Sequence, residues 1–370
     1  MRARRRAGLL LALGSPNACT DEAPPQWRPA FTPFAELVVA SIGAFRPLLA
    51  HLACLLVVAA CDGPQSALDP RGPRARELAE LWWLMAAGAM VIWLFVVGLA
   101  VYATRIRPRD HPDFTGTAFI AGGGVALPLV VLSSLLVYSF LLEREPVALP
   151  GEGLRIEVTG KRWWWEVRYF PPGADEPVVS ANEVRLPVGQ PVEVSLRSTD
   201  VIHSFWIPKL AGKTDMIPGR VNRMVIQAEA PGVSRGQCAE YCGGPHALMA
   251  FYAVAMPPDD FDPWLEHEAR PAPTVEEDLV AEGRELFVTS GCGTCHTIRG
   301  TEADGQLGPD LTHVGGRVSL GAGILPNNIG SIAGWIAGTQ HLKPGNLMPS
   351  FDIFSGSELR ALAAYLESLE

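Results

Sequence analysis

Two long apolar runs constrain what this chain can fold into more than any other feature. The first covers about residues 78–104 and is broken only by Glu80, and the second covers about 117–142 without a charged residue. Each exceeds the roughly 20 residues that an α-helix needs to cross a bilayer. A pair of buried core helices is the alternative, but two such runs joined by a short polar loop favour a transmembrane hairpin. We predict membrane helices over 77–104 and 117–142, joined by a cytoplasmic loop over 105–116.

The first 60 residues contain two export-like signals. The opening "MRARRRAGLLLALG" has a basic start and an apolar run, as secretory signal peptides do. A second segment, "PLLAHLACLLVVAAC", ends at Cys61 in a Val-Ala-Ala-Cys sequence that resembles the bacterial lipoprotein processing box, which implies lipidation of this cysteine. Two signals in tandem indicate a true start downstream of Met1, near Val38 or Val39, and an uncleaved extra apolar helix is the alternative. We assign 1–60 to an export or lipoprotein-type signal region.

The next residues, 61–76, are rich in proline, glycine and arginine, and we predict a linker there. Beyond the hairpin the pattern changes to short alternating segments such as "LRIEVTG", "WWWEVRY", "PVEVSLRS", "RVNRMVIQAE" and "AFYAVAM". Period-2 alternation with frequent turn residues predicts an antiparallel β-sandwich or barrel over 150–268.

A proline-containing linker over 269–275 then leads to a small helical domain over 276–370. Thr274 with Glu277, and Ser355 with Glu358, have the spacing of capping boxes at the start of helices. The predicted fold class is therefore multidomain: a two-helix transmembrane hairpin, an all-β domain and an all-α domain.

The stretch "CAEYCGGPHALM" at 238–249 places four soft or borderline metal ligands within twelve residues. These are Cys238, Cys242, His246 and Met249, and thiolate, imidazole and thioether together favour copper over magnesium or calcium. Gly243, Gly244 and Pro245 allow the tight loop that would bring the ligands together. His203, at the end of a predicted strand, could complete the set.

Two cysteines exceed the single thiolate that a mononuclear blue-copper site uses. Two thiolates can bridge two copper ions, each completed by one histidine and one weaker ligand. Met249 would serve one copper and a backbone carbonyl, that of Glu240, would serve the other. A Cys238–Cys242 disulfide and a structural zinc site are the alternatives.

This ligand pattern, His203 and then Cys238-x-Glu240-x-Cys242-x3-His246-x2-Met249, resembles the binuclear CuA motif of cytochrome c oxidase subunit II. "KTDMIPGRVN" at 213–222, "RWWW" at 162–165 and the preceding hairpin are also similar to that family, so the resemblance covers about 75–268. It implies a cupredoxin fold (a Greek-key β-sandwich or barrel) for 150–268. It also implies that the Glu240 carboxylate faces a magnesium ion at the boundary with subunit I.

Trp163 aligns with the tryptophan through which that family accepts electrons from cytochrome c. On a strand, Trp163 and Trp165 would share one face and Trp164 the other, so simple filling of the core is the alternative role.

A second cluster, Cys292-Gly-Thr-Cys295-His296, fits the C-x-x-C-H attachment motif of covalently bound haem c. A thioredoxin-like redox pair is the alternative, but no βαβ pattern surrounds these residues. "LGPDLTHVGGR" resembles a loop of class I cytochromes c, which implies a fused cytochrome c domain over 276–370. Met348 is the only methionine downstream and is the predicted sixth iron ligand. His313 and His341 are its rivals.

Together these resemblances imply subunit II of a bacterial respiratory cytochrome c oxidase. It would pass electrons from its own haem c to CuA and on to the haem of subunit I, where oxygen is reduced to water. Expected partners are subunit I, subunit III, a cytochrome c donor and membrane lipid. The net charge of −9 argues against nucleic acid.

The positive-inside count of arginines does not decide orientation, since three flank each side of the first apolar run. The lipoprotein and haem motifs place the N-terminus and the C-terminal half on the outer side of the bacterial inner membrane. A CuA subunit of a nitric oxide reductase, a membrane-anchored copper-delivery protein and a plain membrane-tethered electron carrier remain as alternative functions.

Overall fold

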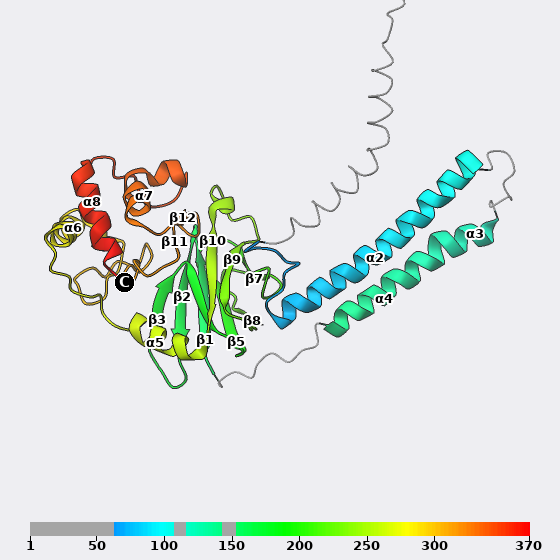
Figure 1. The fold of residues 1–370 in the computed structure, drawn as a ribbon, viewed down its shortest axis with the longest axis horizontal. Coiled ribbons are helices and arrows are strands. Elements are labelled where there is room, and N and C mark those ends of the chain that lie inside the picture. The colour runs from blue at the N-terminus through cyan, green and yellow to red at the C-terminus, as the bar shows by residue number, and fades with distance from the viewer. Residues whose placement is uncertain (1–62, 107–115, 143–152) are drawn as a thin grey trace, which may run out of the picture. The chain divides into compact units, whose positions relative to one another are not determined.

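The computed structural model describes residues 63–106, 116–142 and 153–370 (Figure 1). The export signals, the alternative start sites, Cys61 and most of the predicted cytoplasmic loop lie outside the described residues.

A helical hairpin forms the first described part of the chain. Its elements are α2 (Pro73–Val101), the π-helical turn η1 (Tyr102–Ile106), α3 (Thr117–Ala121), the π-helical turn η2 (Gly122–Ala126) and α4 (Leu127–Leu142). Helix α2 begins before the predicted residue 77 because Pro73 suits the first turn, where an N–H has no intrahelical partner. Arg74 Nη1 donates to the Leu142 carbonyl at 2.9 Å, so a hydrogen bond joins the start of α2 to the end of α4.

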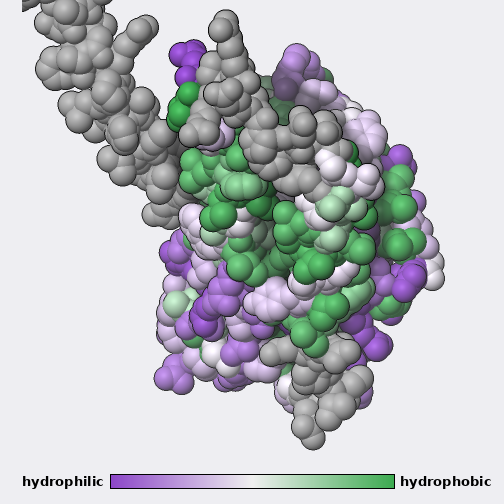
Figure 2. Space-filling model, turned by 90° about the vertical axis from the view of Figure 1, so that its right-hand side faces the viewer, coloured by the Kyte–Doolittle hydropathy of each residue, from purple (hydrophilic) through white to green (hydrophobic). Residues whose placement is uncertain are grey.

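The side chains of the hairpin are apolar and exposed. Phe95 and Leu132 are 64% and 65% exposed, and Figure 2 shows green, hydrophobic residues gathered on the face that carries this hairpin. Both helical segments are long and apolar enough to cross a membrane. Exposed apolar surface of this extent is unfavourable in water and favourable in lipid, which fits the predicted transmembrane hairpin.

The all-β domain is a sandwich of two five-stranded sheets. One sheet has the order β3-β2-β1-β5-β8 and the other β4-β10-β9-β6-β7, with parallel pairing of β1 to β5 and of β4 to β10. The strands are β1 (Arg155–Lys161), β2 (Trp164–Phe170), β3 (Val178–Ala181), β4 (Glu183–Pro187), β5 (Val192–Ser198), β6 (His203–Trp206), β7 (Thr214–Met216), β8 (Asn222–Ile226), β9 (Gly232–Cys238) and β10 (Ala250–Met256). This confirms the predicted cupredoxin-like architecture, whereas the prediction of purely antiparallel pairing is wrong for these two strand pairs, because alternation along a strand does not fix the direction of its neighbour.

The inward-facing residues of both sheets form one core. Trp165 lies at its centre against Phe205 and Phe251, whose rings stack with centroids 4.6 Å apart. Alternation along the strands produces this arrangement, since every second side chain points to the same face. Helix α5 (Pro258–Glu268) covers one edge, with Trp264 against Tyr169.

The segment 63–72, predicted as a linker, packs against the β-domain instead. The Arg71 N–H donates to the Lys209 carbonyl at 2.7 Å, and the Arg71 carbonyl accepts from the Glu229 N–H at 2.9 Å. A proline- and glycine-rich composition shows that a segment has no periodic structure of its own. It does not show whether partners far along the chain bind its backbone.

The C-terminal domain is built mainly from helices. Its elements are α6 (Asp278–Thr289), the 3-10 turn η4 (Cys292–Thr294), the short strands β11 (Ser319–Leu320) and β12 (Leu325–Pro326), α7 (Ile329–Leu342) and α8 (Gly356–Glu367). A further 3-10 turn, η3 (His246–Leu248), belongs to the β-domain, between β9 and β10. Phe287 on α6 and Leu366 on α8 belong to a second apolar core, separate from that of the β-domain. The two-residue strands are an addition to the all-α prediction.

The two predicted capping boxes have opposite outcomes. Ser355 and Glu358 form both reciprocal hydrogen bonds at the start of α8, as predicted. The box at Thr274 is wrong, because α6 begins at Asp278 and its N-cap residue, Glu277, makes no side-chain cap.

Candidate metal and haem sites

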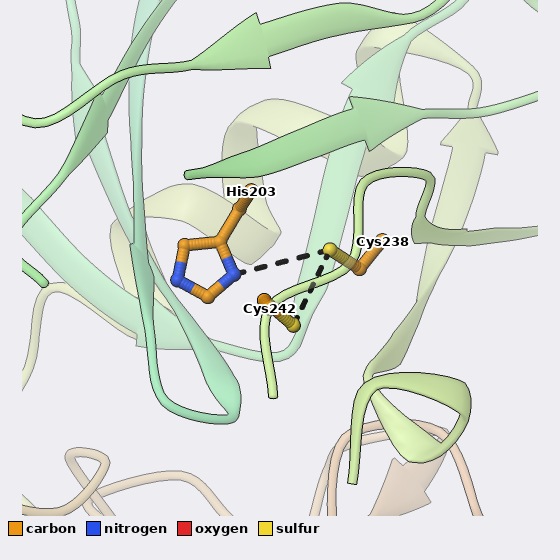
Figure 3. Close-up of side chains that lie close together, drawn as sticks. All are labelled: His203, Cys238 and Cys242. Atoms are coloured by element: carbon orange, nitrogen blue, oxygen red, sulfur yellow. Dashed lines mark hydrogen bonds between the residues drawn. The ribbon is translucent and has the colours of Figure 1, made fainter. Parts of the chain in front are cut away.

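The side chains of His203, Cys238 and Cys242 converge at one end of the β-domain (Figure 3). The Cys238 sulfur lies 3.9 Å from Nδ1 of His203 and 3.7 Å from the Cys242 sulfur. Both cysteines are free thiols, so the disulfide alternative does not describe this structure. The site lies where β9 ends at Cys238 and β6 begins at His203, which corrects our placement of this histidine at a strand end.

The loop after β9, residues 238–249, is here called the copper loop. Within it, Nδ1 of His246 lies 3.5 Å from the Cys242 sulfur, and Sδ of Met249 lies 3.8 Å from the same atom. The carbonyl oxygen of Glu240 lies 3.2 Å from the Cys238 sulfur. All six predicted ligand positions therefore lie around one pair of sulfurs.

His203 is oriented by a residue that we did not predict. Its Nε2 lies 2.8 Å from Oδ1 of Asp200, and because a carboxylate accepts, Nε2 carries the proton. This leaves the lone pair of Nδ1 facing Cys238. A carboxylate behind a ligating imidazole is a common way to fix its tautomer.

Burial and mutual contact set the protonation of the cysteine pair. The hydrogen bond from the Cys242 thiol lowers the pKa of Cys238 to about 3, and the same contact, with burial, raises the pKa of Cys242. The two sulfurs therefore share one proton at neutral pH. A bound cation would displace that proton, since metal ligation requires the thiolate.

The thioether of Met249 is a soft donor that fits copper. Met249 is only 1% exposed, and its sulfur lies beside the Cys242 sulfur. A hard cation such as magnesium or calcium would have no use for this donor set.

Trp163 joins the copper loop to the other candidate site. Its indole Nε1 donates to the Cys242 carbonyl at 2.9 Å, and its ring packs against Gly243. Gly243 has φ +117°, and a Cβ there would lie 2.9 Å from the Trp163 ring. Trp163 precedes strand β2 and is only partly buried, whereas Trp165 fills the core. The alternation argument therefore fails for Trp163, because this residue is not in the strand.

A cavity of about 250 Å³ is lined by all four predicted haem-binding residues, Cys292, Cys295, His296 and Met348. Trp163 also lines this cavity. We call it the haem cavity.

His296 is prepared to act as a ligand. Its Nδ1 donates to the Pro309 carbonyl at 2.8 Å, which leaves Nε2 unprotonated, and burial lowers the pKa of the imidazole. Gly308 packs so closely that a Cβ there would lie 2.4 Å from the His296 ring. This explains the glycine of the "LGPD" loop.

The rivals of Met348 lie elsewhere. His313 is buried with Nδ1 and Nε2 facing the carbonyls of Glu370 and Arg270, and neither it nor His341 lines the haem cavity. Both are therefore poor candidates for the sixth ligand.

The cavity wall also contains an arginine that we did not single out. Arg317 is only 8% exposed, and its Nε has no hydrogen-bond partner among the described residues. A buried donor without a partner is costly, and a haem propionate is a suitable acceptor for it. The residues present therefore fit a haem.

Comparison with known proteins now gives the family. The chain matches the family described as cytochrome c oxidase subunit II, periplasmic domain, over residues 170–255, and the family described as cytochrome c over residues 280–370. Cytochrome c oxidase subunit 2 of Alkalihalophilus pseudofirmus is 34% identical over 329 residues, which cover 85% of this chain and 94% of that protein. The chain belongs to the cytochrome c oxidase subunit II family. The matches confirm the predicted family and the C-terminal cytochrome c domain.

Two further proteins of this family are similar, one over most of the chain and one over the β-domain only. Cytochrome c oxidase subunit 2 of Bacillus subtilis is 28% identical to this subunit II and covers 85% of this chain and 95% of that protein. The periplasmic domain of subunit II of cytochrome oxidase of Bradyrhizobium japonicum, known from a crystal structure, is 31% identical. The match spans 33% of this chain and 96% of the Bradyrhizobium japonicum domain, with a TM-score of 0.30.

Proposed function

We propose that this subunit II carries electrons from its own cytochrome c domain to its copper loop and on to subunit I, where oxygen is reduced to water. The observation that supports this most directly is the place of Trp163. This residue lines the haem cavity and also donates a hydrogen bond to the Cys242 carbonyl in the copper loop. When bound, a covalent haem c and a binuclear CuA centre would each supply one-electron redox chemistry.

The residues of the chain have distinct roles in this proposal. Cys292 and Cys295 would attach the haem, and His296 and Met348 would be the ligands of its iron. Methionine opposite histidine raises the potential of a haem, as a carrier near the end of a respiratory chain needs. Trp163 would be the residue at which electrons reach the copper domain.

In the copper loop, Cys238 and Cys242 would bridge two copper ions. His203, His246, Met249 and the Glu240 carbonyl would complete the two ligand sets. Each ligand comes from a rigid strand end or a glycine-constrained loop, which limits movement during electron transfer. The Glu240 carboxylate would hold a magnesium ion at the interface with subunit I.

The hairpin would anchor both domains to the outer side of the bacterial inner membrane, with subunit I and subunit III as neighbours and a cytochrome c as donor. Anchoring the cytochrome c domain on the same chain replaces an encounter in solution by a high effective concentration. The copper-delivery alternative would leave the haem cavity and its attachment motif without a use.

The test is rapid mixing of the oxidised full complex, kept free of oxygen, with a reduced cytochrome c donor at several concentrations. We expect haem c to be reduced first and the copper band to change afterwards, at a rate independent of donor concentration. Copper reduction that precedes haem reduction, or that scales with donor concentration, would contradict the proposed order.

A further inference from the structure

Lys343 is a buried lysine that the residues assigned above do not explain. It follows helix α7 and is only 2% exposed. Its Nζ donates to the Trp163 carbonyl at 2.7 Å and to the Gly321 carbonyl at 2.9 Å. Among the described residues it forms no ion pair with a carboxylate. Buried lysines are rare without a partner, so this placement calls for a reason.

Burial lowers the pKa of Lys343 to about 7. A neutral amine still has two N–H groups, and there are two carbonyls for it to reach. Both hydrogen bonds can therefore form whether the Lys343 amine is charged or neutral, and the neutral amine needs no carboxylate partner.

The first of these bonds acts on Trp163. Lys343 holds the main-chain carbonyl of this tryptophan from the cytochrome c domain, while the Cys242 carbonyl holds its indole N–H from the copper loop. Trp163 is thus fixed at both ends, by residues 180 positions downstream and 79 positions downstream.

The second bond acts on residues 319–323, here called the docking loop. Lys343 holds Gly321, and the next carbonyl, that of Ala322, accepts from the Ala250 N–H at 2.9 Å. Ala250 directly follows the candidate ligand Met249. A Cβ at Gly323 would lie 3.0 Å from the Ala250 Cβ, so the docking loop and the copper loop are in close contact.

Lys343 also begins the segment that leads to Met348. The side-chain Nδ2 of Asn346 donates to the Lys343 carbonyl at 2.7 Å, and its Oδ1 accepts from the Met348 N–H at 2.8 Å. Lys343 therefore binds Trp163 and the docking loop through its side chain, and the Met348 segment through its main-chain carbonyl and Asn346.

We propose that Lys343 is a positioning residue for electron transfer between the cytochrome c domain and the copper loop. It acts through Trp163 and the docking loop, and this inference rests on the proposed function. Electron tunnelling falls exponentially with distance, so a small loosening of this contact lowers the rate while leaving each redox site intact.

The test compares Lys343→Met with wild type in the full chain, loaded with haem and copper. Methionine has a similar length and no N–H donor. A photoactive ruthenium complex injects one electron into haem c, and the rate of copper reduction is followed optically. We expect a rate lower by about tenfold, because a misplacement on the order of 1 Å is costly in a preorganised site. Lys343→Gln keeps N–H donors on a shorter side chain and should give an intermediate rate.

A second readout does not depend on either cofactor. Hydrogen exchange of the Ala250 amide in the cofactor-free full chain should become faster in Lys343→Met, because the docking loop has lost the bond at Gly321. The matched control is Arg185→Met, which removes a different bond between the two domains, from Nη2 to the Gly316 carbonyl at 3.0 Å. It should change neither the electron-transfer rate nor Ala250 exchange by more than about twofold.

The outcomes separate this inference from the proposed function. If wild type shows no transfer from haem c to copper, the proposed function fails. If wild type shows transfer and Lys343→Met leaves both the rate and Ala250 exchange within about twofold of it, the role of Lys343 is wrong. An equal loss in Arg185→Met would also overturn it, since domain docking in general would then be the cause.

Discussion

The indole Nε1 of Trp163 lies 2.9 Å from the carbonyl oxygen of Cys242, to which it donates a hydrogen bond. Trp163 comes from the segment before β2, and Cys242 is a candidate ligand in the copper loop. The same tryptophan lines the haem cavity. A single aromatic side chain therefore contacts both candidate redox sites, which is the basis of the predictions below.

Replacing Trp163 by phenylalanine should slow transfer from the cytochrome c domain to the copper loop by about tenfold. The smaller ring cannot donate to the Cys242 carbonyl, so the contact with the copper loop is lost. Unfolding free energy should fall by only about 1 kcal/mol, the typical net value of one hydrogen bond. Flash-induced kinetics and urea unfolding measure the two effects, and an unchanged rate would show that electrons bypass this residue.

Replacing Cys242 by serine should abolish binuclear copper binding, because one of the two bridging sulfurs is gone. We expect copper content to fall to one ion per chain or less, measured by atomic absorption after dialysis. The haem spectrum should not change, since the haem cavity is lined by other residues. Two retained copper ions would contradict the bridging role.

Replacing Gly243 by alanine should destabilise the copper loop by about 1–3 kcal/mol. The residue has φ +117°, and a Cβ would lie 2.9 Å from the Trp163 ring. Gly244→Ala is the matched control, because nothing lies within 4 Å of a Cβ at that position. Thermal unfolding of the copper-loaded chain compares the two, and equal losses would mean that the contact with Trp163 has no special cost.

Stability should depend on pH through Lys343. Its folded-state pKa of about 7 lies below the ordinary 10.5, so between these values the unfolded chain holds a proton that the folded chain has released. Wild type should therefore gain stability relative to Lys343→Met as pH rises from 7 toward 10, by up to about 1.4 kcal/mol per pH unit. A negative charge on the neighbouring Cys242 opposes this shift, and copper loading would keep that sulfur deprotonated at both pH values.

Urea unfolding at pH 7 and pH 9 measures this difference for the copper-loaded chains. If the gap between wild type and variant is the same at both pH values, Lys343 remains charged in the folded protein and our account of its burial is wrong.

Much of the copper site could be predicted because four of its side chains fall within twelve consecutive residues, and ligand chemistry limits what such a cluster can bind. His203 is 35 positions away from Cys238, so it had no place in the local cluster and was added from its position at the end of a predicted strand and from the family resemblance. Asp200, three residues before it, had no signal of its own, since a single aspartate in a loop is common.

Lys343 was beyond prediction for a different reason. In "HLKPGN" it has the appearance of a surface lysine, and its partner Trp163 lies 180 positions earlier. Contacts between domains leave no local pattern in either segment. The same holds for residues 63–72, whose composition predicts a linker although their backbone is bound by the β-domain.

The capping boxes show the limit of local motifs. Ser355 and Glu358 precede an amphipathic run that begins at once, so the helix starts where the box requires. Thr274 and Glu277 have the same spacing, but the chain has no regular structure before Asp278, and Glu277 itself is extended. Spacing alone did not distinguish the two.

The most direct test of the central claim is a pair of spectra from the full chain matured with haem and loaded with copper. We predict a multi-line copper hyperfine pattern in low-temperature electron paramagnetic resonance, from one electron shared by two nuclei, beside the visible spectrum of a low-spin haem with histidine and methionine ligands. A four-line copper signal from a single ion, or no bound copper, would contradict the binuclear site on which the account depends.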